Sequence, residues 1–258
     1  MGRRERASPR RDFFVGARPA QDMQNEDVRR TNAPIQTARR KGRAQTKSDA
    51  RQRDNRLNLY IDDHFALGLS VYAAAGVRVG QELTRADLEA LAHAEALERA
   101  REAALRFLEI RPRSAQELRR QLAKKNFSEE TITQVIARLS AVELVDDRDF
   151  AKYWVENREG FKPRSKRALQ YELRQKGVAA DDIARAVKKV DERDSAYRAA
   201  RPKALRWKDL DAPTFRQKLS GLLARRGFDY GVARETVQRL WREVNGTDQD
   251  LNQAFEME

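Results

Sequence analysis

The sequence predicts a mainly α-helical protein: a tandem array of three three-helix repeats, preceded by a small β-hairpin element and a disordered basic tail. The main evidence is a pattern that recurs at intervals of 51 and 50 residues. It appears as ELRRQLAKKNF from Glu117, ALQYELRQKGV from Ala168 and KLSGLLARRGF from Lys218. Leucines fill the same two positions of each segment, and an apolar residue ends it. A fixed period of this length is typical of stacked copies of one supersecondary unit.

The composition limits the classes of function. Charged residues make up 36% of the 258 residues, which suits exposed helices around thin cores. No run of 18 apolar residues occurs, and the Arg-rich N-terminus lacks the apolar region of a secretory signal. The chain has no cysteine, which excludes disulfides, thiolate nucleophiles and Cys-ligated zinc. We therefore expect a cytoplasmic protein with no membrane span.

The net charge of +13 is unevenly distributed along the chain. Residues 1–56 hold 16 Lys and Arg against 7 Asp and Glu, which gives +9, and the remaining 202 residues hold 37 against 33, which gives +4. Residues 1–56 also contain few large apolar side chains, so we expect a disordered tail. Its arginines fit two roles equally, non-specific attachment to nucleic acid or a solubilising tail.

Residues 57–98 are expected to form the N-terminal folded element. Apolar and polar residues alternate from Leu57 to Leu69 around Asp62-Asp63-His64, which predicts a β-hairpin with one apolar face. A lone histidine at a turn is usually solvated, since metal binding and catalysis need partner groups, so we interpret His64 as solvated. Thr84, with an acidic residue three positions later, predicts a helix start, and the residues up to Pro112 are expected to form one long helix or two nearly continuous ones.

The three repeats are expected at residues 99–144, 145–190 and 191–246, followed by a frayed C-terminus at 247–258. In the first repeat, Ser114 and Glu117 have the spacing of a capping box, and Ser128 begins the next helix.

The second and third repeats have the same layout. Asp146 and Ser165 begin helices of the second repeat, and Gly177 ends one in a left-handed conformation. In the third repeat, we expect helices to begin at Asp191 and Thr214, and Gly227 to end the second of them.

Residue patterns for catalysis, cofactor binding and metal binding are missing from the sequence. There is no P-loop and no dinucleotide-binding fingerprint, and the only histidines are His64 and His93. Asp146, Asp147 and Asp149 could suggest a divalent cation, but acidic residues at a helix start are better explained as caps that complement the helix dipole. We therefore predict no catalytic, cofactor or metal site, and a protein that is not an enzyme.

The aromatic and basic residues remain as candidates for binding. Trp154 and Trp241 fit the apolar faces, so we assign them to packing, whereas Trp207 follows Arg206 near a loop and could stack on a base. Each repeat also carries a cluster of cations around its second helix. The candidate residues for binding are Arg111, Arg113, Arg119, Arg120, Lys124 and Lys125 in the first repeat, Lys162, Arg164, Lys166, Arg167, Arg174 and Lys176 in the second, and Lys203, Arg206, Arg216, Lys218, Arg225 and Arg226 in the third.

These clusters have two interpretations. Charged runs are usually solvated faces, but recurrence at corresponding positions of stacked repeats would place the cations along one basic strip, as on the binding faces of repeat proteins.

At this point the sequence resembles the RecX family of bacterial regulators of the recombinase RecA. The resemblance depends on ALRFLEIRPRSAQELRRQLAKKNF (104–127), VDDRDFAKYWVENR (145–158) and PRSKRALQYELRQKGV (163–178), and the segment LNLYIDDHFALGL followed by VRVGQEL is similar to an N-terminal extension of some members. It covers about residues 57–244 and is looser in the third repeat. Where related proteins are often glycine-rich, this chain has Phe161 and Lys162.

The resemblance implies three three-helix repeats that lie in the groove of a RecA–single-stranded DNA filament. It further implies that the protein limits filament extension, ATP hydrolysis, strand exchange and coprotease activity of RecA, in homologous recombination, DNA repair and the SOS response. The expected partners are the RecA filament and single-stranded DNA, with duplex DNA as a further DNA partner, and we expect a monomer that needs no cofactor.

One alternative is a stand-alone DNA-binding protein of the helix-turn-helix type, because three-helix units with a basic second or third helix also suit a major groove. Tight duplex binding with sequence preference and without RecA would favour it.

Overall fold

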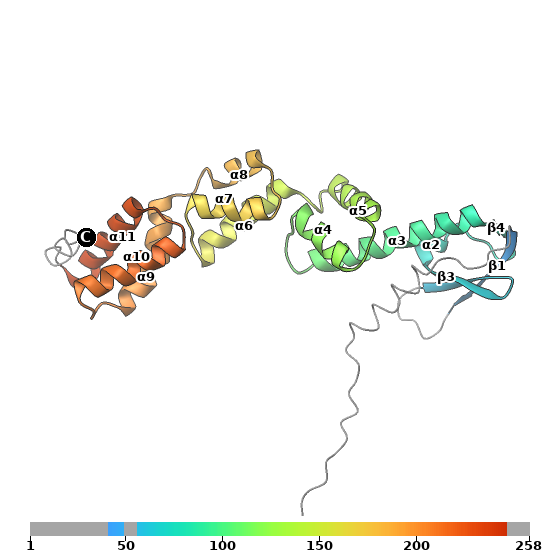
Figure 1. Cartoon of the computed structure of the whole chain (residues 1–258), viewed down its shortest axis with the longest axis horizontal. Coiled ribbons are helices and arrows are strands. Elements are labelled where there is room, and N and C mark those ends of the chain that lie inside the picture. The colour runs from blue at the N-terminus through green and yellow to red at the C-terminus, as the bar shows by residue number, and fades with distance from the viewer. Residues whose placement is uncertain (1–40, 49–55, 247–258) are drawn as a thin grey trace, which may run out of the picture. The chain divides into compact units, whose positions relative to one another are not determined.

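The computed structural model describes residues 41–48 and 56–246 (Figure 1), and within β1 it describes only one side chain. The chain divides into two compact units, Met1–Glu95 and Ala96–Glu258. The predicted mainly α-helical fold with tandem three-helix repeats is confirmed. Most of the predicted tail and the predicted frayed C-terminus lie outside the described residues. Within the described ranges, no helix is long and apolar enough to cross a membrane.

The first unit contains a four-stranded antiparallel sheet, larger than the predicted hairpin. Its strands are β1 (Lys41–Ser48), β2 (Arg56–Ile61), β3 (His64–Ser70) and β4 (Glu82–Thr84), in the spatial order β3-β2-β1-β4. The β2–β3 hairpin is confirmed, and its turn residues Asp62 and Asp63 have φ values of 47° and 63°. The sequence did not predict β1 or β4, and β1 falls within the range for which it predicted disorder.

Helix α3 (Arg85–Leu108) begins in the first unit and continues into the second. Its predicted start is confirmed: the Thr84 N–H donates to Asp87 Oδ2 at 2.8 Å, and the Asp87 N–H donates to Thr84 Oγ1 at 3.2 Å. The Thr84 hydroxyl also donates to Asp87 Oδ2 at 2.7 Å, and this bond, together with that from the Thr84 N–H, lowers the pKa of the Asp87 carboxyl. The short helix α2 (Val71–Ala74) precedes β4. Buried apolar residues of the sheet, α2 and the start of α3 form the core of this unit, from Ala44 to Leu88.

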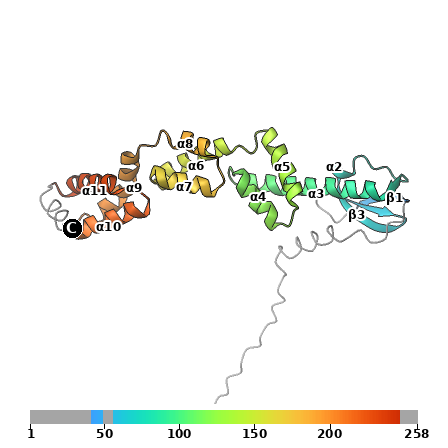
Figure 2. The same ribbon diagram turned by 45° about the horizontal axis from the view of Figure 1, so that its top comes forward.

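The second unit consists of three helix triplets, whose helices can be followed along the chain in Figure 2. Each triplet has its own apolar core. The first triplet contains the second half of α3 with α4 (Ala115–Lys124) and α5 (Glu129–Ala141). The second contains α6 (Asp147–Phe161), α7 (Lys166–Gln175) and α8 (Ala180–Val187). The third contains α9 (Glu192–Arg206), α10 (Ala212–Arg225) and α11 (Tyr230–Asn245).

The leucines that define the sequence pattern lie in these cores. In every triplet both leucines of the second helix are fully buried, as Leu118 and Leu122 illustrate in the first. Trp241 is also buried, and its ring centroid lies 5.0 Å from that of Phe215, which confirms its assignment to packing. Burial of such side chains removes apolar area from water and stabilises each triplet.

Most predicted helix starts are confirmed. Ser114, Ser128, Asp146, Ser165 and Asp191 each accept a backbone N–H from the first turn of the following helix.

The predicted start of α10 is wrong. The helix begins at Ala212, where the Asp211 side chain accepts the Thr214 N–H at 3.1 Å. Thr214 therefore lies inside the first turn and is not the cap. The third repeat lacks a serine at the position of Ser114 and Ser165, and Pro213 fits the first turn because no backbone N–H is needed there.

Candidate interaction surface

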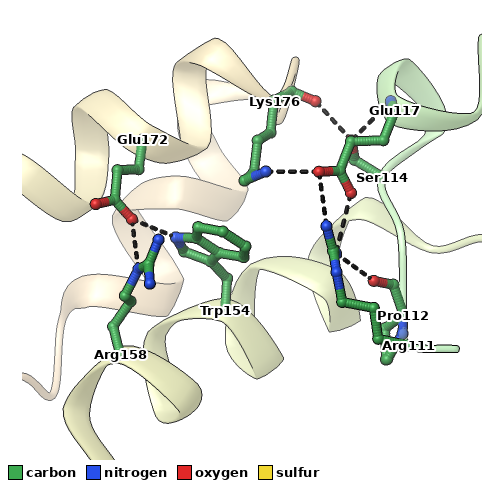
Figure 3. Close-up of polar contacts among 8 residues, drawn as sticks. All are labelled: Arg111, Pro112, Ser114, Glu117, Trp154, Arg158, Glu172 and Lys176. Carbon is green, nitrogen blue, oxygen red and sulfur yellow. Dashed lines mark hydrogen bonds and ion pairs between the residues drawn. The ribbon is translucent and has the colours of Figure 1, made fainter. Parts of the chain in front are cut away.

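Successive triplets are joined by contacts between their second helices. Ser114, the N-cap of α4, accepts the Glu117 N–H at 3.1 Å and also donates its hydroxyl to the Lys176 carbonyl at the end of α7, at 2.7 Å (Figure 3). At the next junction the N–H of Ser165 donates to the Arg226 carbonyl at the end of α10, at 3.2 Å. At both junctions, therefore, the N-terminus of one triplet's second helix contacts the C-terminus of the next triplet's second helix: α4 contacts α7, and α7 contacts α10.

A carboxylate completes each junction. The Ala115 N–H at the start of α4 donates to Asp147 Oδ1 at 2.8 Å, and the Lys166 N–H at the start of α7 donates to Glu192 Oε1 at 2.8 Å. Both acids are the first residue of the first helix in the next triplet. Burial raises the pKa of Asp147, and the bond from Ala115 opposes that rise. Asp147 thus bonds to the start of α4, and among the described residues no group of three or more His, Cys, Asp or Glu side chains is placed to hold a metal ion.

Two glycines allow this close approach. Gly177 and Gly227 follow the C-caps of α7 and α10 with φ values of 79° and 87°. A Cβ atom on Gly177 would lie 2.6 Å from the Cβ of Gln116, and one on Gly227 would lie 2.8 Å from the Cβ of Ala168. The equivalent residue of the first triplet is Asn126, with φ 62°, which has a side chain and no preceding triplet to contact. Glycine is therefore needed for the junction as well as for the left-handed backbone.

Two charge groups surround the first junction (Figure 3). Glu117 accepts from Lys176 Nζ at 2.6 Å and from Arg111 Nη2 at 3.1 Å. Burial alone would raise the pKa of Glu117, but the hydrogen bonds from Arg111 and Lys176 lower it below its ordinary value.

The second group is built on Trp154. Its Nε1–H donates to Glu172 Oε2 at 2.7 Å, and the Arg158 Nε–H donates to the same oxygen at 2.8 Å. The Lys176 ammonium lies 4.1 Å from the centre of the Trp154 ring. Trp154 is therefore a packing residue, as predicted, and it also binds cations through its ring face.

Several predicted binding residues are occupied by these internal contacts. Arg111 and Lys176 bind Glu117, Arg164 Nε lies 3.0 Å from Glu172 Oε1, and Arg226 donates to the Pro163 carbonyl at 3.2 Å. Burial, together with the nearby Arg164 charge, lowers the pKa of Arg226. Lys176 and Arg226 thus link successive triplets, and the charge of all four cations is not available to a partner at full strength.

Five more predicted residues are half-buried. The Arg113 guanidinium lies 3.9 Å from the centre of the Phe107 ring, and burial lowers its pKa. Arg119 forms an ion pair with Glu129. The remaining half-buried members are Lys125, Lys166 and Arg216.

The other nine predicted residues are exposed, and we call them the exposed cations. They are Arg120, Lys124, Lys162, Arg167, Arg174, Lys203, Arg206, Lys218 and Arg225. Their side chains have no hydrogen bond or ion pair within the described ranges, and the Lys218 ammonium lies 5.7 Å from the centre of the Trp207 ring. Trp207 itself is half-buried at the C-cap of α9 and packs against the third core, so its ring is not a free stacking platform.

A cavity of about 820 Å³ lies at the second junction, lined by α7, the start of α9 and the α10–α11 connection. Its lining contains Arg164, Lys166 and Arg167, and also Glu172, Glu192 and Asp229. Cations and carboxylates are equal in number there, so the cavity has no clear preference for an anion. Tyr171, which is exposed, also lines it.

The division into units changes the charge distribution inferred from the sequence. Residues 96–246 hold 35 Lys and Arg against 23 Asp and Glu, which gives +12. Residues 57–258 together have a net charge of only +4, because acidic residues on either side of the triplets offset this excess. The triplets also carry exposed positive side chains that were not among the predicted binding residues, including Arg138, Arg148, Lys188 and Lys189.

Comparison with known proteins assigns the chain to a family. Residues 100–139 match the family model for the first three-helix domain of RecX, and residues 146–187 match that for the second. The regulatory protein RecX of Mycobacterium avium is 42% identical over 145 residues, which cover 54% of this chain and 83% of the relative. This chain belongs to the RecX family. The regulatory protein RecX of Prosthecochloris aestuarii is 39% identical over 137 residues, 53% of this chain and 90% of the relative.

A solved structure agrees with the RecX fold. The crystal structure of a regulatory protein RecX superposes with a TM-score of 0.55 and covers 83% of this chain and 99% of its own chain. Its sequence identity is 19%, so it supports the shared fold alone.

Proposed function

We propose that this RecX-family protein is a regulator of RecA that acts by binding and not by catalysis. It binds in the groove of the filament that RecA forms on single-stranded DNA. There it limits filament extension, and with it ATP hydrolysis, strand exchange and the coprotease activity. Membership of the RecX family is the observation that carries this proposal.

The charges of the triplets support this proposal. Residues 96–246 have a net charge of +12, and the exposed cations recur in all three triplets. Each exposed cation alone contributes little binding free energy in water. Contacts made by linked units raise the total affinity, because each later contact forms at a high effective concentration. A tandem protein can therefore bind a polymer of identical subunits, or the phosphates of its DNA, through many weak contacts.

We further propose that the protein acts as a monomer in the cytoplasm and needs no cofactor. The three triplets lie in one chain, so neighbouring subunits of a filament can be bridged without a second copy. Stand-alone binding to duplex DNA is the competing function, and the experiments below distinguish the two.

The ATPase activity of RecA on single-stranded DNA tests the proposal. Full-length protein added below the concentration of RecA is expected to slow ATP hydrolysis progressively, because one bound molecule affects a growing filament. Unchanged ATP turnover and unchanged filament length at equimolar protein would contradict the proposed function.

A pair of matched variants tests whether the position of the cations matters. The first replaces Arg120, Lys124, Arg167 and Arg174 with Gln, and the second replaces Arg138, Arg148, Lys188 and Lys189 with Gln. Both remove four exposed positive charges from the triplets. We expect the first variant to bind the filament at least tenfold more weakly than the second, since specific contacts and not net charge alone fix the complex. Equal weakening would refute the selected cations as the binding surface.

A further inference from the structure

Two exposed apolar side chains occupy the same position in successive triplets. Ile110 is 74% exposed and Phe161 is 81% exposed. They lie 51 residues apart, which is the repeat interval. Among the large exposed hydrophobic residues of the described ranges, no other pair is separated by 50 or 51 residues.

The fold explains the residues that follow Ile110 and Phe161, but it does not explain why these two exposed side chains are apolar. The two segments read Ile-Arg-Pro-Arg-Ser from Ile110 and Phe-Lys-Pro-Arg-Ser from Phe161. Each serine caps a helix and takes part in a junction, and Arg111 binds Glu117. The apolar side chain that begins each segment stays in solvent. Single exposed hydrophobic residues are normal on proteins, but recurrence at an equivalent position points to a shared use.

The chemistry of the pair indicates the class of partner. Isoleucine has no ring to stack on a nucleobase, so the property that both residues share is apolar shape, which suits pockets on protein surfaces. Residues 96–246 carry a net charge of +12, which favours an acidic protein surface around those pockets. The equivalent residue of the third triplet is Asp211, which caps α10, so only two triplets carry the feature.

We propose that Ile110 and Phe161 are equivalent anchors that enter the same apolar pocket on two neighbouring subunits of an acidic protein polymer. The inference rests on the proposed function, under which that polymer is the RecA filament. Two apolar anchors at equivalent positions of two similar units match two identical pockets on successive subunits. The second anchor then binds intramolecularly, which raises the total affinity.

The test uses the full chain and three variants: Ile110→Ser, Phe161→Ser and the double variant. The matched control is Val142→Ser with Leu144→Ser, which removes two exposed apolar side chains that do not recur. Affinity is measured for RecA filaments assembled on fluorescent oligo(dT) with a non-hydrolysable ATP analogue, and for the same oligo(dT) without RecA. We expect about tenfold weaker filament binding for each single variant, as burial of one such side chain predicts, a larger loss for the double variant, and less than threefold for the control.

The outcomes separate this inference from the proposed function. If the wild-type chain does not bind filaments, the proposed function fails. If the wild-type chain binds but the double variant matches the control, or if only one anchor matters, the paired-anchor inference fails alone. Equal losses on bare oligo(dT), or a self-association that Phe161→Ser abolishes, would assign these side chains to DNA or to a second copy and overturn it. Unchanged urea unfolding midpoints verify that the variants remain folded.

Discussion

Replacing Gly177 with alanine should show how much the close contact at the first junction contributes to the free energy of unfolding. The glycine follows the C-cap of α7 with a φ of 79°, in contact with the start of α4. Alanine would introduce two costs at once: a side chain on a left-handed backbone, and a Cβ atom 2.6 Å from the Cβ of Gln116. Because both costs arise at this one residue, the loss of unfolding free energy can be compared with the loss at a glycine that has a similar φ but no close neighbour.

The first cost is about 1–2 kcal/mol for a non-glycine residue in the left-handed region. The second is about 1–3 kcal/mol, the range for inserting a methyl group where neighbouring atoms must move. The close atom is the Cβ of Gln116, which is fixed to the backbone of α4 and cannot move without it. We therefore expect a total loss of about 2–5 kcal/mol of unfolding free energy.

Urea unfolding followed by circular dichroism and tryptophan fluorescence measures this loss, and Gly246→Ala is the control. Gly246 ends α11 with a φ of 78°, and no described atom lies within 4 Å of a Cβ placed there. The control should lose at most the backbone cost of about 1–2 kcal/mol. Gly227→Ala should resemble Gly177→Ala, because its added Cβ would lie 2.8 Å from the Cβ of Ala168.

Equal losses for Gly177→Ala and Gly246→Ala would refute this reasoning. They would mean that glycine is needed only for its backbone conformation, and that α4 and α7 do not approach as closely as described.

Other predictions address the same junction. Ser114→Ala should cost about 2 kcal/mol against about 1 kcal/mol for Ser128→Ala in urea unfolding, since both are N-caps but only Ser114 also bonds to the next triplet. The pKa of Glu117 is lowered in the folded state, so its contribution is complete above the ordinary value of 4.5 and is lost as pH falls through and below it. The stability difference between wild type and Glu117→Gln should accordingly be larger at pH 7 than at pH 3. Asp147→Asn should lie within about 0.5 kcal/mol of wild type at pH 7, because the amide oxygen still accepts the Ala115 N–H and the desolvated charge is gone, whereas Asp147→Ala should cost about 1–2 kcal/mol.

Local signals in the sequence predicted the helices well. Serine and aspartate caps combined with apolar residues one turn apart were sufficient for α4, α5, α6, α7 and α9, because capping and core burial act within a few residues. Helix α8 begins after Ala179, which makes no side-chain cap bond, and only its apolar spacing indicated it. Strand β1 was missed because KGRAQTKS lacks an alternating apolar pattern, and its pairing with β2 and β4 is a tertiary effect. The start of α10 was misplaced because Thr214 and Gln217 have the spacing of a capping box, whereas the third triplet uses Asp211 as the cap.

The binding surface was harder to predict than the fold. The sequence shows where cations occur, but not that Lys176 would meet Glu117, 59 residues away. Charged pairs of this kind form only when the triplets stack, so no local pattern distinguishes a junction cation from an exposed one. The recurrence of Ile110 and Phe161 could have been found by aligning the repeats, although their exposure could not.

The proposal that this protein binds the RecA filament is best tested by two affinities. One is its affinity for RecA filaments on single-stranded DNA, and the other is its affinity for the same DNA without RecA. At every salt concentration between about 50 and about 200 mM, we expect tighter binding to the filament than to bare DNA, since contacts with RecA remain when phosphate contacts are screened. Equal or tighter binding to bare DNA, or sequence-specific binding to duplex DNA without RecA, would contradict it.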